Sequence, residues 1–317
     1  MLARMSIVTP SILEWVPAAD AVPETVAATI DALKLSSAEV EWLMSCDVER
    51  LFKALGPEPC PRKEQFFACE CVRRVHHLLD DPAPLAAIDV AERFAHGEAS
   101  NEELRIAGEA ARRAAQAARK IAEGAWSLGW DVPRVKAAWM RVWAASAAEN
   151  ACGANTRVVT EESVPEGGKG LRTALVAAWA HMMSTQAVAD EVADEPLTDT
   201  GMFFSFLREL KRTTEDIQQA RDRADPSCEA VQQAHLLREI FGNPFRSAPF
   251  DPSWRTPLIN ATAATIYQER DWGAMPMLGD LLEQAGCPNG SPLLRHCHGP
   301  CTHVRGCWVL DLVLGRE

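Results

Sequence analysis

The sequence has few of the features that mark β-structure. Its 317 residues include a single tyrosine. β-branched residues rarely alternate with polar ones, and no Asn-Gly or Asp-Gly dipeptide joins two alternating apolar runs. Strands show such alternation because successive side chains face opposite sides of a sheet. These absences disfavour a β-sandwich, a barrel or a parallel sheet, and they favour an all-α fold.

A long uninterrupted apolar run is also missing. A helix that crosses a bilayer needs about 20 consecutive apolar residues, and no stretch of this sequence approaches that length. Near the N-terminus, Arg4 and the apolar residues around it resemble a secretion signal, but Pro10, Glu14 and Pro17 interrupt the run. We therefore expect a cytoplasmic protein without a membrane partner. Its ten cysteines are then expected to be reduced, as buried apolar side chains or metal ligands.

Positive charge is in deficit. Lys and Arg number 32 against 44 Asp and Glu, which makes this an acidic protein with a net charge of −12. Such a field opposes non-specific attraction to nucleic acid and to anionic membranes. Hydrophobic residues make up 47% of the chain, the usage of an ordinary globular protein that can bury a sizeable core. The balance favours a protein or a small molecule as partner.

The familiar catalytic motifs are missing as well. The chain contains no Gly-x-Ser-x-Gly, no His-Glu-x-x-His and no dinucleotide glycine fingerprint. The glycine-rich segment from Glu166 to Gly170 contains Lys169, but it lacks the upstream glycine, the following Ser or Thr and the preceding strand of a P-loop. No reaction can be named from these patterns.

Helix signals, in contrast, recur along the whole chain. Ser36 and Glu39 have the spacing of a capping box, and Gly56-Pro57 is a helix breaker. The clearest period lies in 101–123, where an apolar stripe consists of Leu104, Ala107, Ala111, Ala114, Ala118 and Ile121. The predicted helices are 36–44, 47–55, 61–79, 84–97, 101–123, one from 133, 171–192, 202–224, 227–241, 257–269, 275–285 and 291–297.

These segments predict an all-α, multi-helix bundle with Ala/Trp-rich middle helices. We expect a single α-helical domain over residues 1–317, interrupted by a flexible loop at about 152–170 where Gly and Pro cluster. An irregular, Cys/His-rich tail is expected at 287–317. The tryptophans of the middle helices fall on predicted inner faces, so core packing explains them.

The tail contains the densest group of potential metal ligands. Seven such residues fall within 21 positions: Cys287, His296, Cys297, His298, Cys301, His303 and Cys307. Zinc takes four Cys or His ligands in a tetrahedron. Cys301 and His303 are separated by a single residue, which is tighter than a zinc knuckle allows. A wider set, Cys287, Cys297, His303 and Cys307, relieves this crowding and would form a closed structural site; the alternative is a tail of buried thiols and surface imidazoles.

Other pairs have plainer interpretations. His235 and Glu239 share one face of a predicted helix and can bind metal, but without a second pair nearby we interpret them as a surface hydrogen-bonding pair. Cys69 and Cys71 face different directions on their helix and are expected to be core thiols.

Four phrases of the sequence are distinctive: Phe67 to Arg74, Ala91 to Ala95, Leu237 to Arg246, and the closing run from Val304 to Gly315, which follows His296-Cys297 and has an Arg-Gly-Cys-Trp-Val-x-Asp-Leu-x-Leu-Gly pattern. Together they resemble a paralogue-rich family of uncharacterised bacterial proteins. The likeness brackets the chain after about residue 40 and leaves out the loop near Gly168. It implies that the segments at both ends pack into one body, and that Cys287, Cys297, His303 and Cys307 belong to the shared pattern. The family brings no established activity.

The leading functional hypothesis is a helical interaction or adaptor protein with a zinc-stabilised tail. Its predicted binding residues are Asn243, Phe245 and Arg246, in a proline-containing turn, together with Arg305, because aromatic and guanidinium groups dominate interface hot spots. One alternative is a metal-dependent hydrolase, which needs an open coordination position. Another is a nucleic-acid-binding accessory protein that uses the basic tail, against the net charge.

Overall fold

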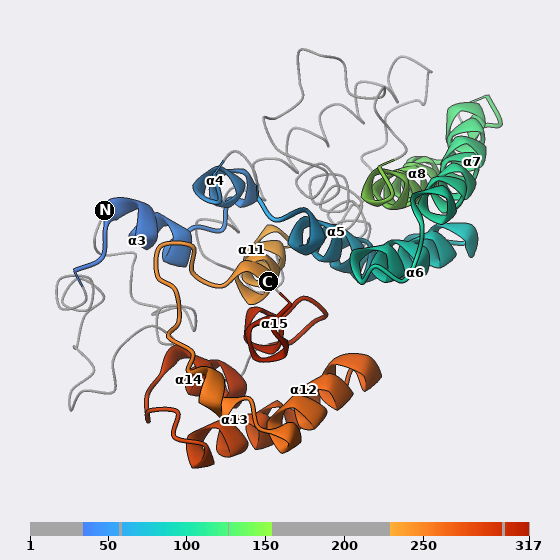
Figure 1. Ribbon diagram of the computed structural model, residues 1–317. Coiled ribbons are helices and arrows are strands. Elements are labelled where there is room, and N and C mark those ends of the chain that lie inside the picture. The colour runs from blue at the N-terminus through green and yellow to red at the C-terminus, as the bar shows by residue number, and fades with distance from the viewer. Residues whose placement is uncertain (1–33, 57–58, 126, 154–228, 300–301, 317) are drawn as a thin grey trace. The chain divides into compact units, whose positions relative to one another are not determined.

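The computed structural model (Figure 1) describes residues 34–56, 59–125, 127–153, 229–299 and 302–316. Within these ranges every regular element is a helix and no strand occurs, which confirms the all-α prediction. None of the described helices is both long enough and apolar enough to span a membrane. The predicted helices at 171–192 and 202–224, and the predicted loop beyond Gly153, lie outside the described residues.

The observed helices follow the predicted ones closely. In chain order they are α3 (Ser37–Met44), α4 (Val48–Ala54), α5 (Pro61–Arg74), η2 (His76–Leu78), α6 (Ala83–Ala95), α7 (Asn101–Ala125), α8 (Val132–Ala151), α11 (Glu229–Phe241), η4 (Pro252–Trp254), α12 (Pro257–Glu269), η5 (Trp272–Ala274), α13 (Met275–Gln284), α14 (Pro292–His298) and α15 (Trp308–Leu314).

The chain divides into two compact units. Unit 1 consists of Met1–Ser45, Lys53–Gly56 and Ala234–Glu317, and unit 2 of Cys46–Phe52 and Pro57–Gln233. Unit 1 thus joins an N-terminal segment with the C-terminal one. Each unit is defined by its own contacts, and the single domain over 1–317 stays a prediction.

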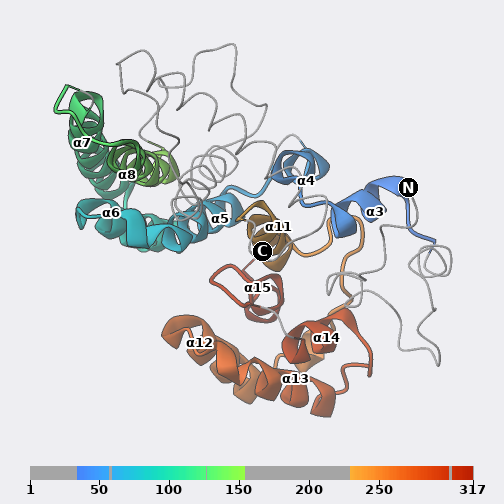
Figure 2. The same ribbon diagram turned by 180° about the vertical axis from the view of Figure 1, so that it is seen from behind.

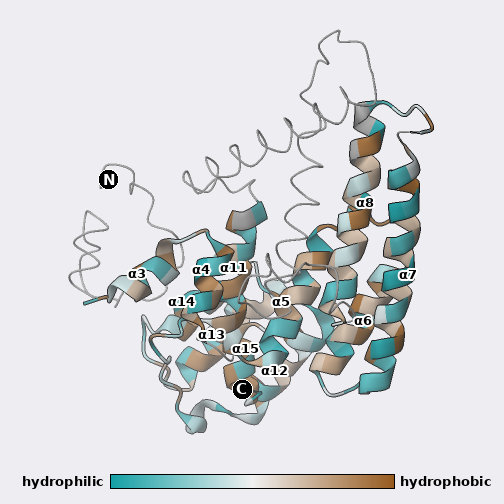
Figure 3. Cartoon of the chain, turned by 90° about the horizontal axis from the view of Figure 1, so that it is seen from above, coloured by the Kyte–Doolittle hydropathy of each residue, from teal (hydrophilic) through white to brown (hydrophobic). Residues whose placement is uncertain are grey.

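Unit 2 contains α5, α6, α7 and α8, of which α7 and α8 lie side by side (Figures 1 and 3). The face that α7 buries consists of Leu104 and of the small residues Gly108, Ala111, Ala114, Ala115, Ala122 and Ala125. Ile121, predicted on this stripe, is 56% exposed, because the buried register passes to Ala122 and each helical residue is rotated by about 100° from the next. Small side chains let the two helices approach closely.

Ion pairs support the packing within unit 2. The Arg73 guanidinium bonds Asp89 and Glu92, both at 2.8 Å, and Arg74 makes a bidentate pair with Glu229 at 2.9 Å. Glu229 is 4% exposed, so its charge needs this partner. The neighbouring thiols of Cys69 and Cys71 are fully buried, and burial raises their pKa. They are core thiols, as predicted.

Unit 1 contains α3, most of α11, and α12 to α15, which Figure 2 shows from behind. Ser36 caps α3 by accepting from the Glu39 amide at 3.1 Å, as the capping box predicts. The Trp42 indole donates to the Gly242 carbonyl at 3.1 Å, and the Arg238 guanidinium donates to the Trp42 carbonyl at 2.8 Å. These bonds attach α3 to the end of α11.

The tail is more helical than the sequence indicates. α14 begins where Ser291 accepts from the Leu294 amide at 3.3 Å and Pro292 occupies the first turn. α15 is a seven-residue apolar helix, too short to show a helical period, and most of its residues are buried. Tertiary burial rather than local propensity stabilises a helix of that length.

Candidate metal centre

Four buried side chains of unit 1 meet at one point. They are Glu239 on α11, His296 on α14, and His303 and Cys307 from the segment between α14 and α15. One potential ligand atom of each lies within 4.8 Å of all the others. The group therefore brings together one carboxylate, two imidazoles and one thiol from three stretches of the chain.

Local structure explains how each side chain arrives there. Glu239 lies on the buried face of α11 between Leu237 and Ile240, both fully buried. His296 lies on the inner face of α14, whose start is set by Ser291. Cys307 immediately precedes α15, after a turn in which the Gly306 amide donates to the Tyr267 hydroxyl at 3.2 Å.

Gly242 leaves room for the Trp308 side chain next to the four ligands. It ends α11 with a φ of +70°, and a β-carbon there would lie 3.1 Å from the Trp308 indole ring. Only glycine adopts this backbone conformation without strain and leaves room for the ring. Trp308 can therefore pack against the end of α11 and reach His296.

The distances between the ligand atoms suit both a hydrogen-bonded cluster and a metal. The Glu239 carboxylate lies 3.0 Å from His303 Nδ1 and 3.2 Å from His296 Nε2, and His296 Nε2 lies 3.2 Å from Cys307 Sγ. A tetrahedral zinc with bonds of about 2.0–2.3 Å holds its ligand atoms about 3.3–3.6 Å apart. Small outward movements of these side chains would admit the ion.

Electrostatics favour an ionised carboxylate at the centre. Burial by itself raises the pKa of Glu239, but the hydrogen bonds of His296 and His303, and the positive charge of these imidazoles when protonated, outweigh it and lower this pKa below its usual range. Burial lowers the pKa of His303, and the hydrogen bonds to Cys307 and Glu239 overcome this and raise it. A metal ion must therefore displace a proton at His303 before that imidazole can coordinate.

Trp308 determines which nitrogen of His296 carries a proton. Its indole Nε1 donates to His296 Nδ1 at 3.3 Å, and an indole N–H is only a donor. In this contact His296 Nδ1 is the acceptor, so the neutral imidazole carries its proton on Nε2, facing Glu239 and Cys307. Coordination through Nε2 would move that proton to Nδ1, where it would oppose the Trp308 N–H.

The structure brings together two of the four metal ligands predicted from the sequence, His303 and Cys307. The thiol of Cys287 instead lies 3.1 Å from the Ser291 hydroxyl. Cys297 belongs to the apolar core of unit 1, where burial raises the pKa of its thiol to about 12. His296 is one of the seven candidate ligands of the tail but does not belong to the set preferred from the spacing.

Glu239 was interpreted from the sequence as a surface residue, and that interpretation is wrong, because its side chain is 6% exposed. The spacing of His235 and Glu239 indicated that Glu239 could bind a metal. That interpretation was not adopted, because no second pair of ligands lies nearby in the sequence. That second pair comes from α14 and the segment before α15. Of the remaining candidates, Cys301 lies outside the described residues, and His298 is exposed and bonds Asp280 at 3.1 Å.

The predicted binding residues have contacts inside unit 1. The Asn243 amide donates to the Glu39 carboxylate at 2.9 Å, and the Arg246 guanidinium pairs with the same carboxylate. Arg305 donates to the Gln268 carbonyl at 3.2 Å. Phe245 is 39% exposed, and its amide donates to the Asn243 side chain at 2.9 Å, which orders the turn.

We predict that Arg246→Ala destabilises unit 1. Glu39 is 3% exposed, so the substitution removes the countercharge of a buried carboxylate, and the free energy of unfolding should fall by about 1–3 kcal/mol. Chemical denaturation measures this change. Adding Glu39→Gln should restore part of the loss, because a neutral amide needs no countercharge. Equal losses in the two backgrounds would contradict the role assigned to the pair.

Comparisons with known proteins add no assignment to this site. No family model, no curated protein and no solved structure matches the chain. The resemblance to a bacterial family is therefore still a hypothesis, and the four buried side chains have to be interpreted from their own chemistry.

Proposed function

We propose that this chain is a helical adaptor protein of the cytoplasm whose unit 1 is organised by a zinc ion bound to Glu239, His296, His303 and Cys307. The observation that carries the proposal is the meeting of these four buried ligand atoms within 4.8 Å. Burying two imidazoles, a carboxylate and a thiol together is costly unless each finds a strong partner. A metal ion supplies one partner for all of them.

The donor set suits zinc. Zinc binds thiolate, imidazole and carboxylate ligands and accepts a tetrahedral arrangement of four of them. Magnesium and calcium take oxygen ligands, of which this group offers one carboxylate. When bound, the ion would cross-link α11, α14 and the start of α15, and its binding free energy would add to the stability of unit 1.

A structural role fits the site better than a catalytic one. The exposed fractions of the four side chains are 6% or less, and four protein ligands complete the coordination of zinc. The metal-dependent hydrolase considered from the sequence needs an open position and substrate access. Binding of nucleic acid through the tail is disfavoured by the net charge of −12 and by the contact of Arg305 with Gln268.

The turn after α11 supports the adaptor part of the proposal. Asn243 joins this turn to Glu39 by one hydrogen bond and to the Phe245 amide by another. The turn is thereby held in one conformation, and it presents the exposed Phe245 ring. Ordered aromatic side chains bind partners well because little conformational entropy remains to be lost.

The metal proposal is tested by the zinc content of untagged protein and of two variants. Wild type should contain about one zinc per chain. Glu239→Gln, which is nearly isosteric, should lose the metal, and Cys287→Ser should keep it because Cys287 lies outside the group. Retention by Glu239→Gln together with loss in Cys287→Ser would support the ligand set predicted from the sequence. A metal-free wild type would refute zinc binding altogether.

We predict that Trp308→Phe raises the zinc affinity of the folded protein. Phe lacks the N–H that opposes a proton on His296 Nδ1, so the affinity should increase by about ten-fold, the scale of changes around metal ligands. Competition with a chromophoric chelator measures the affinity. Trp139→Phe, which changes a tryptophan of α8 in unit 2, should leave the affinity unchanged. A weaker affinity in Trp308→Phe would show that the indole supports coordination.

We predict that Phe245→Ala abolishes partner binding without unfolding the chain. The ring is 39% exposed, as a contact residue requires, and Leu258, at 61% exposed, provides a control on another surface of unit 1. Partners captured from cell extract by wild type should be lost with Phe245→Ala and kept with Leu258→Ala. Identical capture by all three proteins would remove Phe245 from the binding surface.

A further inference from the structure

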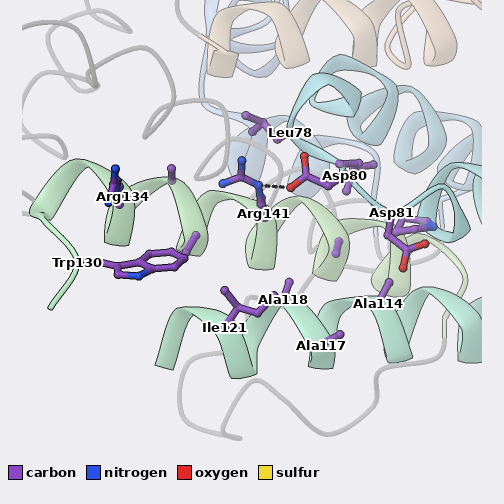
Figure 4. A pocket seen from close by; sticks show the side chains of 15 residues that line it. Leu78, Asp80, Asp81, Ala114, Ala117, Ala118, Ile121, Trp130, Arg134 and Arg141 are labelled. Atoms are coloured by element: carbon purple, nitrogen blue, oxygen red, sulfur yellow. Dashed lines mark hydrogen bonds and ion pairs between the residues drawn. The ribbon is translucent and has the colours of Figure 1, made fainter. Parts of the chain in front are cut away.

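Unit 2 contains a cavity that belongs neither to the metal centre nor to the adaptor turn. Its volume is about 600 Å³, and it is lined by α7, α8 and the segment from Leu78 to Pro84 (Figure 4). Small-molecule sites commonly have volumes of about 300–1,000 Å³. The cavity is therefore large enough for a ligand of ordinary size.

The lining is mainly apolar and has little side-chain bulk. Six alanines from α7 and α8 form much of its surface, and Ile121 and Trp130 are among the larger apolar side chains that line it. Ile121 is the residue predicted to be buried that is 56% exposed, and its place on the cavity wall accounts for this. An apolar ligand body would cover the ring of Trp130 and the Ile121 side chain.

Some of the charged side chains that line the cavity have an ion-pair partner and others do not. Asp80 pairs with Arg141, and Asp81 accepts from the Ala83 amide at 2.8 Å, at the start of α6. Asp80 therefore has a countercharge, whereas Asp81 is hydrogen-bonded to a helix end and keeps its negative charge. Arg134, seven residues before Arg141 on α8 and therefore on the same helical face, has no carboxylate partner among the described residues. The first turn of α8 is capped by the Asp131 carboxylate, which accepts from the Arg134 amide at 3.0 Å and offsets the positive end of the helix dipole. The guanidinium of Arg134 is thus the positively charged group of the cavity without an ion pair among the described residues.

We propose that this cavity binds an amphipathic monoanion, an apolar carboxylate whose body rests on the alanine, Ile121 and Trp130 surface and whose carboxylate pairs with Arg134. A cationic ligand would meet two guanidinium groups and, with Asp80 paired to Arg141, only the carboxylate of Asp81. A neutral ligand would leave Arg134 without a countercharge. The inference concerns unit 2 and is independent of zinc binding in unit 1.

The test uses two fluorescent dyes that differ only in charge. 8-Anilinonaphthalene-1-sulfonate is N-phenyl-1-naphthylamine with one added sulfonate, so the pair isolates the contribution of the anion. The full-length protein should bind the anionic dye about ten-fold more tightly than the neutral one, the effect expected of one charged hydrogen bond. Decanoate should displace the anionic dye at a concentration about ten-fold lower than decanol requires.

Three variants locate the site. Arg134→Gln should weaken binding of the anionic dye by about ten-fold and leave the neutral dye unaffected, whereas Arg113→Gln, on an exposed position outside the cavity, should change neither. Ala117→Phe, at an exposed alanine on the cavity wall, should exclude both dyes. Circular dichroism confirms folding, and if Ala117→Phe does not fold, Arg134→Gln decides alone. Equal binding of the two dyes, or an unchanged affinity in Arg134→Gln, would overturn the proposal.

Discussion

A carboxylate buried at the centre of unit 1 has to be compensated, and much of that unit is arranged around this requirement. Glu239 projects from α11 into a region walled by α14 and by the segment before α15. Its partners are the imidazoles of His296 and His303, at 3.2 and 3.0 Å. An unpaired carboxylate at this depth would cost several kcal/mol. The positions of α14 and of the turn at Gly306 are therefore coupled to the side chain of one residue on α11.

The same side chains can exist as a hydrogen-bonded network or as a metal site. Trp308 influences which of the two is favoured. Its N–H contact with His296 favours a proton on Nε2 of that imidazole. Metal coordination favours the opposite tautomer. Gly242 is part of this balance, because the absence of a β-carbon there gives the indole its place. The proposed zinc affinity therefore depends on residues that coordinate nothing.

Unit 2 follows a different principle. Its helices approach through alanine, a residue that loses no side-chain entropy when it is ordered. Small side chains also fill space poorly, and where α7, α8 and the segment before α6 diverge, they leave a cavity. Close packing along one face and open space beside it thus have the same origin in composition. Because Arg134 has no ion-pair partner among the described residues, we expect the cavity to prefer an anionic ligand.

Several features of this protein could be predicted from residues close together in the sequence. The capping box at Ser36, the proline at the start of α12 and the apolar period of 101–123 each act over a few residues, so helix positions followed from them. Short apolar α15 could not be predicted, because its helix depends on burial rather than on local preference. The shift from Ile121 to Ala122 likewise depended on the face that α8 covers.

The candidate site also combines features that the sequence predicts with features that only the fold brings about. The ligand types and the importance of His303 and Cys307 were evident from the density of Cys and His in the tail. Spacing could not select the remaining two ligands, because Glu239 is 57 residues before His296 along the chain and meets it only in the fold. In the same way, Asn243 and Arg246 have the composition of a binding surface, but burial of Glu39 turns them inward. Local chemistry was determined by the sequence, and the partners of each buried charge were decided by tertiary packing, since compensation acts through space.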